Sequence, residues 1–439
     1  MTKSLLGSLA STFTVLGLLF PWTGKPLPPP PTLAPKPTPI NSIKLGDCTP
    51  WEQVNINAFG ISSNSNDSNP PYASEEAFEV AAFHGKLYLG MEGDNSVGAR
   101  LWRSTNPLPL PGDWEEVAAD EAGQPFGVES VSQADHIDSL AVFQGQLYAS
   151  LANRSGNSTG VLLFRSPTGN AGSWENALGT RGPGFGIPAN ENFKDMQVFQ
   201  NNLCGGTWNE TSGAQVWCSS DGENWYLSNF PGFGNQDNII IWSGGVFNDY
   251  LYFGVQNRGE NIFMAKDDEG KIFRTHDIHN PLAWEEVYSG YPGSIQSDIL
   301  GVSGDYIYIS TSSASGIQIW RSSSGAGWSW KLVNVAGMNR DRANWGTITD
   351  GAAIYNFGLY VAVSNMKTGV QIWRTANNSA PLVWELINTP GFGDPANHHA
   401  QLISFRGHLY AWATNYHQGQ GVWRTRCTTL PSQEFIPQQ

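Results

Sequence analysis

The sequence predicts an all-β chain built from one repeated unit, and three observations lead to that prediction. Charged residues make up 14% of the 439 residues, against roughly 25% in an average soluble protein, which excludes long charged helices. The 49 Gly, 27 Pro and 18 Trp residues indicate many turns and aromatic-rich strands. Three strand-like patterns also recur in a fixed order, so a repeat architecture is expected.

The three patterns differ in composition. The first is a hairpin of the form Phe-x-Gly-x-Leu-Tyr, whose last position is Tyr88, Tyr148, Cys204, Tyr252, Tyr308, Tyr360 and Tyr410. The second is a strand with an aromatic residue, usually followed by Arg, at Trp102, Phe164, Trp217, Phe273, Trp320, Trp373 and Trp423. The third is a Trp-centred strand, at Trp114, Trp174, Trp225, Trp284, Trp330 and Trp384. The third pattern therefore lacks a copy after Trp423.

The missing copy lies at the opposite end of the chain. The run Trp51-Glu52-Gln53-Val54 matches Trp114-Glu115-Glu116-Val117 and Trp284-Glu285-Glu286-Val287. The Tyr positions are 48 to 60 residues apart, which is the period of a four-stranded propeller blade with long loops. The predicted fold is a seven-bladed β-propeller of four-stranded antiparallel blades, closed by an N-terminal outer strand. The alternative, a pair of β-sandwiches, predicts no match between the two ends.

The four cysteines fit this closure. Cys48 and Cys427 flank the predicted junction between the last strand and residues 51–54, and a bond between them would lock the ring. Cys204 and Cys218 face each other across one predicted hairpin. Two disulfides with no thiol left over indicate an oxidising compartment. The alternative, four free thiols in a cytosolic protein, conflicts with an N-terminus that predicts export.

The N-terminal residues predict export. The mostly apolar run from Leu5 to Phe20 has the length of a signal-peptide core, so residues 1–20 are either a cleaved signal or a retained anchor. Residues 21–47 are a Pro-rich linker expected to adopt extended polyproline geometry. Residues 48–427 form the propeller and 428–439 a C-terminal tail. The expected location is extracellular or at the cell surface.

The charge limits the partners. A net charge of −14 and a pI near 5.0 make nucleic acid an improbable partner, because that binding mode needs clustered Lys and Arg. Membrane contact is expected only through residues 5–20, and only if they are retained. The expected partner is a glycan or an extracellular protein.

Two known repeat families resemble parts of this pattern. The order Leu-Tyr, Trp-Arg and Trp is similar to kelch-type blades, although the double Gly of that family occurs only at Gly205-Gly206. The stretch from Ser219 to Trp225 resembles the Asp-box of sialidase-like propellers, with one residue fewer between Asp221 and Trp225. The resemblance covers residues 48–427 at the level of fold. Neither motif specifies chemistry, because both are turn and packing devices.

The face with long loops is the predicted ligand surface. Long loops on a rigid scaffold are where binding residues concentrate, and the loops after the second strands carry Asn at matching positions. The candidate ligand-binding residues are Asn153, Trp208, Asn209, Asn257, Asn365, Asn415, Tyr416 and His398. The structural alternative is that Asn holds tight turns by bonding its own backbone and that Trp packs between blades.

Acidic residues recur near the start of each predicted inner strand. They are Glu79, Asp138, Asp195, Asp298 and Asp350. Four of them, Asp138, Asp195, Asp298 and Asp350, are the candidate metal ligands, since a carboxylate ring could hold Ca²⁺. The alternative is that they cap backbone N–H groups or water. No other cofactor is expected.

The sequence contains no recognisable catalytic motif. A sialidase-like mechanism needs an Arg cluster, but the Arg residues here repeat after an aromatic residue and predict a structural role. No nucleophile elbow, zinc motif or phosphate loop occurs. We therefore expect a secreted or surface-displayed binding module, with glycans as the first candidate ligand, and no enzyme. The alternative is a glycan-active hydrolase or lyase with its site at the channel mouth.

Overall fold

The computed structural model describes residues 46–61, 77–92, 98–118, 126, 134, 136–153, 159–258, 269–290, 293–348, 351–356, 358–375 and 382–428. The predicted signal or anchor, most of the linker and the tail from residue 429 lie outside these ranges. No helix within them is long and apolar enough to cross a bilayer. The described part consists mainly of β-strands, which confirms the all-β prediction.

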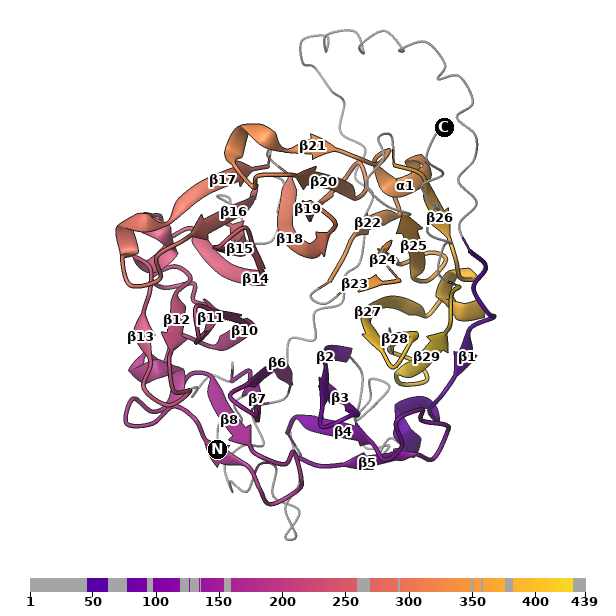
Figure 1. Ribbon diagram of the computed structural model, residues 1–439, viewed down its shortest axis with the longest axis horizontal. Helices are drawn as coiled ribbons and strands as arrows, with labels where there is room; N and C mark the ends of the chain where they lie inside the picture. The colour runs from indigo at the N-terminus through magenta and orange to yellow at the C-terminus, as the bar shows by residue number, and fades with distance from the viewer. Residues whose placement is uncertain are drawn as a thin grey trace, which may run out of the picture. The chain divides into compact units, whose positions relative to one another are not determined.

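The described strands form five hydrogen-bonded sheets, and the largest of them joins three antiparallel sets. The strands therefore fall into seven sets, each of which runs outward from a strand near the centre of Figure 1. The first contains β2 (Ala77–Phe83), β3 (Lys86–Met91), β4 (Arg100–Ser104) and β5 (Trp114–Glu116). The second contains β6 (Ile137–Phe143), β7 (Gln146–Leu151), β8 (Leu162–Ser166) and β9 (Glu175–Asn176). The third contains β10 (Asn192–Phe199), β11 (Asn202–Trp208), β12 (Val216–Ser219) and β13 (Tyr226–Leu227).

The remaining sets follow the same plan. The fourth contains β14 (Asn238–Phe247), β15 (Tyr250–Asn257), β16 (Glu269–Thr275) and β17 (Glu285–Ser289). The fifth contains β18 (Ser294–Ser303), β19 (Tyr306–Ser313), β20 (Gln318–Ser322) and β21 (Lys331–Leu332). In the sixth, β22 (Asn344–Gly346) and β23 (Ala352–Tyr355) both pair with β24 (Gly358–Asn365), followed by β25 (Gln371–Thr375) and β26 (Trp384–Leu386). The last contains β27 (Asn397–Phe405), β28 (His408–Asn415), β29 (Gly421–Thr425) and β1 (Glu52–Gln53).

The helical segments of the described part are short and lie in loops. They are η1 (Asn57–Gly60), η3 (Pro183–Gly186), η4 (Pro231–Gly234), η5 (Pro281–Ala283), η6 (Gly327–Ser329), α1 (Gly337–Arg340) and η7 (Pro390–Gly393). In η3 the residue Gly184 has φ 61°, and a Cβ on Gly160 would lie 2.6 Å from the Gly184 Cα. Glycine is therefore required at both positions. The turn directs Phe185 onto Trp217 of the next set, with 4.8 Å between stacked rings.

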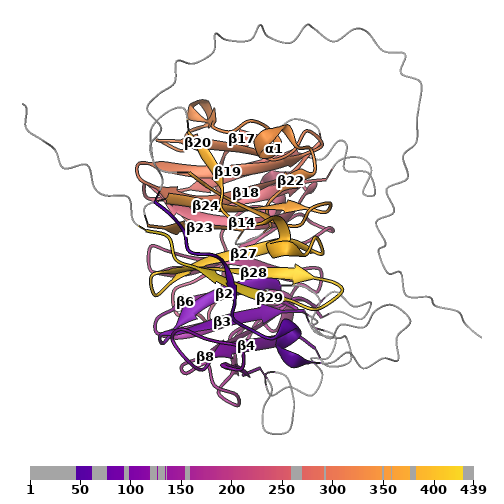
Figure 2. The same cartoon turned by 90° about the vertical axis from the view of Figure 1, so that its right-hand side faces the viewer.

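The sets are arranged around a common centre (Figure 1). The central strands contact one another in chain order, from β2 to β6, β10, β14, β18, β23 and β27, and β27 contacts β2. Seen from the side, the sheet of β27 to β29 lies beside that of β2 to β4 (Figure 2). This arrangement of radial antiparallel sheets is that of a β-propeller.

The strand nearest the N-terminus of the described part joins the last set. In β1, Glu52 lies opposite Arg424 and Gln53 opposite Trp423, in antiparallel register. A guanidinium nitrogen of Arg424 lies 2.6 Å from the Glu52 carboxylate. The same pair joins the third and fourth strands within the first set, where Arg103 is 2.6 Å from Glu115. The repeated Arg therefore holds the outer strand in place.

The repeated Trp side chains link each set to the one before it. The indole Nε1 of each Trp of the third pattern, and of the matching Trp51, donates to a backbone carbonyl of the preceding set at 2.7 to 3.0 Å. The pairs are Trp114 to Val54, Trp174 to Val117, Trp225 to Ala177, Trp284 to Ser228, Trp330 to Val287, Trp384 to Val333 and Trp51 to Ile387. These bonds form a closed cycle that includes residues from both ends of the described chain.

Both predicted disulfides are confirmed. Cys48 bonds Cys427 and Cys204 bonds Cys218, and none of the four cysteines is free. Cys48 and Cys427 also form an isolated antiparallel bridge, so the bond lies at the end of the β1–β29 pair. Cys204 and Cys218 lie opposite each other on β11 and β12. Two disulfides indicate that the chain folds in an oxidising compartment.

Candidate functional site

The described acidic residues of the predicted ring lie on the central strands. Glu79 is in β2, Asp138 in β6, Asp195 in β10 and Asp298 in β18. Each lies two or three residues before the residue that pairs with the repeated Tyr or Cys of the second strand. Asp350 falls outside the described residues. The repeat therefore predicted the position of these side chains along the inner strands.

Asp138 forms a buried ion pair with the next set. Lys194 Nζ lies 2.7 Å from Asp138 Oδ1, and the amide of Asn192 donates to Asp138 Oδ2 at 2.6 Å. His136 Nε2 lies 3.4 Å from the same Oδ1. Burial alone would raise the pKa of Asp138, but the charges of Lys194 and His136 outweigh it and lower the pKa well below its ordinary range. The ionised carboxylate joins two blades.

Aromatic rings surround this ion pair. Lys194 Nζ lies 5.1 Å from the ring centre of Trp242 and 5.9 Å from that of Phe78. Phe78 stacks on His136 with 4.3 Å between ring centres. These contacts desolvate the ammonium group and add cation–π attraction. The cluster is therefore closed by its own side chains and serves the contact between β6, β10 and β14.

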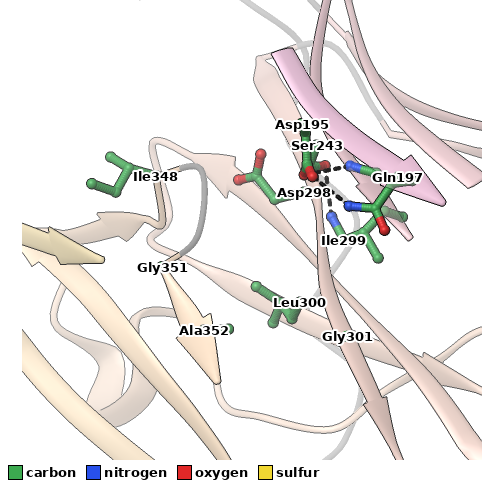
Figure 3. A pocket seen from close by; sticks show the side chains of 11 residues that line it. Asp195, Gln197, Ser243, Asp298, Ile299, Leu300, Gly301, Ile348, Gly351 and Ala352 are labelled. Carbon is green, nitrogen blue, oxygen red and sulfur yellow. Dashed lines mark hydrogen bonds between the residues drawn. The ribbon is translucent and has the colours of Figure 1, made fainter. Parts of the chain in front are cut away.

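A cavity of about 150 Å³ opens between the central strands of the third to sixth sets (Figure 3). Its lining residues are Asp195, Gln197, Ser243, Gly244, Asp298, Ile299, Leu300, Gly301, Ile348, Gly351 and Ala352. Asp195 and Asp298 are the carboxylic acids among its described lining residues, and both are labelled in the close-up view (Figure 3). Glycine and alanine on β14, β18 and β23 leave the space open. The cavity therefore brings together two of the acids predicted from the repeat.

Asp298 is buried and lies among neutral groups. Gln296 Nε2 donates to Asp298 Oδ1 at 2.6 Å, and the Thr347 hydroxyl donates to Oδ2 at 2.8 Å. Ser310 lies 2.9 Å from the Thr347 hydroxyl and extends this network. Burial raises the pKa of Asp298 to about 6, because these neutral hydrogen bonds only partly compensate for the lost solvation. This carboxyl group exchanges a proton near neutral pH.

Asp195 lies at an irregularity of β10. The pairing of β10 with β11 shifts between Lys194 and Gln197, and Asp195 has φ 44°. Its carboxylate accepts hydrogen bonds from Gln197 Nε2 at 2.5 Å and from the backbone N–H of Gly244 at 2.6 Å. The cavity thus combines Asp298, a buried acid with a raised pKa, with Asp195, whose carboxylate accepts two N–H hydrogen bonds.

The hydrogen bond from the Gly244 N–H to Asp195 has counterparts in the second and fourth sets. The hydroxyl oxygens of Ser139 and Ser243 accept backbone N–H groups of Met196 and Ile299 at 2.9 and 2.8 Å. Asp195 takes the same place in the repeat and adds a negative charge that serine lacks. The third set therefore differs from the second and fourth sets in the charge at this position, and not in the hydrogen bond to the next blade.

Replacing Asp298 with Asn is expected to raise the free energy of unfolding at pH 7 by roughly 3 kcal/mol. The folded pKa of about 6 exceeds the unfolded value, so the protonated carboxyl stabilises the fold below about pH 4. That stabilisation is lost as the pH rises through 6. Urea unfolding at pH 4 and pH 7 checks this, with a gain only at pH 7. Asp305→Asn, in an exposed turn, is the control and should change neither value.

The metal prediction concerns the same acids. Among the described residues, no three His, Cys, Asp or Glu side chains are grouped so that they could hold a metal ion. Asp138 lies against Lys194, whereas Asp195 and Asp298 line one cavity. Asp350 falls outside the described ranges. Calcium binding by these residues stays a prediction.

The predicted ligand-binding asparagines lie at the ends of the second strands and hold turns. The side-chain oxygen of Asn209 accepts the N–H groups of Thr211 and Ser212 at 3.0 and 2.8 Å, and its amide donates to Asn190 at 2.8 Å. Asn365 and Asn415 make the same set of bonds. The amide of Asn257 donates to Asn238, and that of Asn153 donates to the Gly160 carbonyl. Ligand contact through these residues stays a prediction.

The three predicted aromatic and His residues lie on the same loop face. Trp208 ends β11, donates to Glu210 at 3.2 Å and packs 6.3 Å from Trp242. His398 and Tyr416 lie 5.8 Å apart in the last set, away from the cavity residues. Partial burial and the neighbouring His399 and His417 lower the pKa of His398. Trp208 therefore lies in the third set, whereas His398 and Tyr416 lie together in the last set.

Sequence reasoning missed the partners of the acids. Lys194, Gln197 and Thr347 were not singled out, although Lys194 directly precedes Asp195 in a predicted inner strand. The signal available in the sequence was Lys194 itself, a positive charge at an inner-strand position of one repeat alone. The Asp221 turn was anticipated: its carboxylate accepts the N–H groups of Glu223 and Asn224 at 2.9 and 2.7 Å. Its assignment as an Asp-box stays a prediction.

Comparison with known proteins gives similarity in structure only. No protein-family model and no curated protein sequence matches the chain. A mutant Trypanosoma rangeli sialidase with trans-sialidase activity matches at 12% identity and TM-score 0.46, over 87% of this chain and 59% of that one. Polysaccharide lyase Uly1 matches at 10% identity and TM-score 0.48, over 88% and 100% of the two chains.

A third similar structure is the β-propeller domain of the Trilobed protease from Pyrococcus furiosus. It is 8% identical with TM-score 0.46, and 82% of this chain and 98% of that chain are covered. The matched sialidase is longer than the region it shares, since this chain spans only 59% of its length. At these identities the comparisons concern the fold and not the activity.

The prediction that the chain is not an enzyme is wrong. The solved structures that share its fold include a sialidase and a polysaccharide lyase. The sequence argument relied on the lack of a local motif, and a site composed of separate inner strands has no such motif. We therefore withdraw the non-enzymatic module.

Proposed function

We propose that the chain is a glycan-active hydrolase whose site is the cavity between β10, β14, β18 and β23. The observation that supports this most directly is the pair of carboxylic acids, Asp195 and Asp298, in one small cavity. Hydrolysis of a glycosidic bond uses two carboxyl groups, one as general acid and the other as base or nucleophile. The channel-mouth site considered from the sequence is thus preferred to the long-loop surface.

The environments of the two acids suggest their roles. Asp298, with its pKa raised to about 6, keeps a proton for the leaving glycosidic oxygen. Asp195, which accepts two N–H hydrogen bonds, is the carboxylate that removes a proton from the attacking water. The C–O bond to the leaving group breaks as the bond from C1 to the water oxygen forms. Asp195 ends protonated and Asp298 ionised, so protons balance.

The proposed substrate is a glycan outside the cytosol. The two disulfides agree with secretion, and the location at the cell surface or in the medium belongs to this proposal. The asparagine-bearing loops and Trp208 lie at the ends of the second strands, where they would extend the contact beyond the cavity. Calcium is not part of the proposed reaction.

Asp298→Asn is expected to lower kcat/KM on the best substrate by about 10²–10⁴-fold, the usual contribution of a general acid. A panel of chromogenic glycosides followed by polysaccharides finds that substrate, with wild type, Asp298→Asn and Asp195→Asn assayed together. Asp305→Asn is the matched control and keeps full activity. Because Asp298→Asn is expected to be stable at pH 7, its inactivity would not come from unfolding.

Three results would count against this proposal. Turnover that survives both Asp195→Asn and Asp298→Asn would place the chemistry elsewhere. An unsaturated product, formed by elimination without water, would identify a lyase. Absence of turnover on every glycan tested would leave no support for a hydrolase.

A further inference from the structure

The described residues that line the cavity between Asp195 and Asp298 carry charge of one sign. Eleven described residues line it, and none of these is Lys, Arg or His. The charged groups among these described lining residues are two aspartic acids. A ligand that enters it therefore meets negative charge and hydrogen-bond acceptors.

Three cations of the sets around the cavity are held by acids outside it. Lys194 is adjacent to Asp195 in the chain, but its Nζ is buried against Asp138 at 2.7 Å. The Arg residues of the neighbouring fourth and sixth sets lie in the third strands, where Arg274 and Arg374 pair with Glu285 and Glu385. The third set has Cys218, bonded to Cys204, at the corresponding place.

No described Lys, Arg or His side chain lines the cavity, so its described lining offers no cation to an acidic group. A carboxylate placed between Asp195 and Asp298 would be repelled, since like charges within a few ångströms oppose each other strongly in a site of low dielectric. A hydroxyl or ammonium group has the opposite preference. Carboxylate oxygens accept hydrogen bonds from both, and an ionised acid offers about four acceptor positions.

The size of the cavity suits one sugar ring. A cavity of about 150 Å³ admits a bare six-membered ring, as an engineered cavity of that volume binds benzene, so the hydroxyl substituents of a sugar would extend beyond this volume. Gly244, Gly301 and Gly351 contribute no side chains to it, and Ile299, Leu300 and Ile348 form apolar walls. Polar acceptors at one part and apolar surface at another match the hydroxyl edge and the C–H face of a sugar.

We propose that the sugar unit bound between Asp195 and Asp298 carries no acidic group and is a neutral or amino sugar. This inference rests on the proposed hydrolase and names its substrate class. Sialic and uronic acids are excluded from this position, and an amino sugar gains attraction from the Asp195 carboxylate and hydrogen bonds with both acids. Elimination by a lyase, which requires a uronic acid, is excluded at this site for the same reason.

Matched glycosides that differ in one group test this inference. The wild-type protein is assayed with 4-nitrophenyl glycosides of glucose, glucosamine and glucuronic acid, and with the corresponding galactose series. We expect kcat/KM for the neutral or amino member to exceed that for the uronic acid by at least about 100-fold. Preference for the uronic acid, or for a sialoside, would overturn the inference while leaving the hydrolase intact.

A binding experiment keeps the inference testable if no glycoside is cleaved. The methyl glycosides of the same sugars are titrated against the protein and followed by ligand-detected NMR. Binding of the neutral or amino sugar, weakened by Asp195→Asn, supports the inference even when the hydrolase proposal fails. Equal or tighter binding of the uronic acid overturns it, and so does binding of none of them.

A charge introduced into the cavity gives a positive test. Gln197→Lys places an ammonium group on the cavity wall, and we expect it to shift the ratio of uronic to neutral sugar binding by about 10-fold or more towards the acid. Gln236→Lys adds the same charge on an exposed turn and should leave the ratio unchanged. An equal shift in both variants would show a general effect of net charge and would contradict the assignment to the cavity.

Discussion

Replacing Asp138 with Asn is expected to lower the free energy of unfolding by about 3–5 kcal/mol, because Lys194 would stay buried without its counter-ion. The ammonium group lies against Trp242 and Phe78 and cannot regain water without a change in the inner strands. Urea unfolding at pH 7 measures the loss, with Asp305→Asn as an exposed control. Loss below about 1 kcal/mol would contradict a buried, paired lysine.

The double replacement Asp138→Asn with Lys194→Met gives an internal check. Removing both charges should recover much of the lost stability, since an apolar side chain of similar size needs no counter-ion. The pH dependence has a definite sign: the folded pKa of Asp138 is lowered, so its contribution is present at neutral pH and is lost as the pH falls below the ordinary Asp range. The double variant should lack this dependence on acid.

Replacing Cys48 and Cys427 with Ser is expected to lower the free energy of unfolding by about 6 kcal/mol, roughly twice the effect of replacing Cys204 and Cys218. The two bonds close loops that differ greatly in length, with sequence separations of 379 and 14. The longer loop restricts the unfolded chain more, so its loss gives the unfolded state more entropy. Denaturant unfolding of both double variants provides the comparison.

The order of the two effects is the decisive outcome. A larger loss from Cys204→Ser with Cys218→Ser would mean that the bond at the chain ends does not restrain a closed ring. The Cys48→Ser, Cys427→Ser variant should also release β1 first, and hydrogen exchange at Glu52 and Gln53 would report it. The inner strands of the first six sets should keep their protection.

Sequence reasoning predicted the parts of the fold that repeat. The Tyr, Arg and Trp positions recur because each blade uses the same contacts, and so the unmatched run at Trp51 was assigned to the last set. Position along the inner strand was also predictable, which placed Asp138, Asp195 and Asp298. The Asn side chains after the second strands illustrate the limit: local turn geometry and ligand binding favour the same residue type.

The partners across blades were not predictable. Lys194 meets Asp138 and Thr347 meets Asp298 only because inner strands about 50 residues apart in sequence lie side by side. The shift of register between Lys194 and Gln197 determines where the Asp195 carboxylate lies. No sequence pattern predicts this shift. Asp138 and Asp298 are the same residue type, but their surroundings differ. Asp138 therefore joins two blades, whereas Asp298 lines a cavity.

The pairing of β1 with β29 sets an order of events during protein synthesis. The strand that leaves the ribosome first among the described ones has no partner until Trp423, 370 residues after Gln53, has been added. At roughly 5–20 residues per second, the interval is about 20–70 s. A strand edge that stays unpaired for this long can pair with other chains. The polar pair Glu52-Gln53 makes such pairing less favourable, so the same Glu that binds Arg424 in the finished ring also protects the nascent chain.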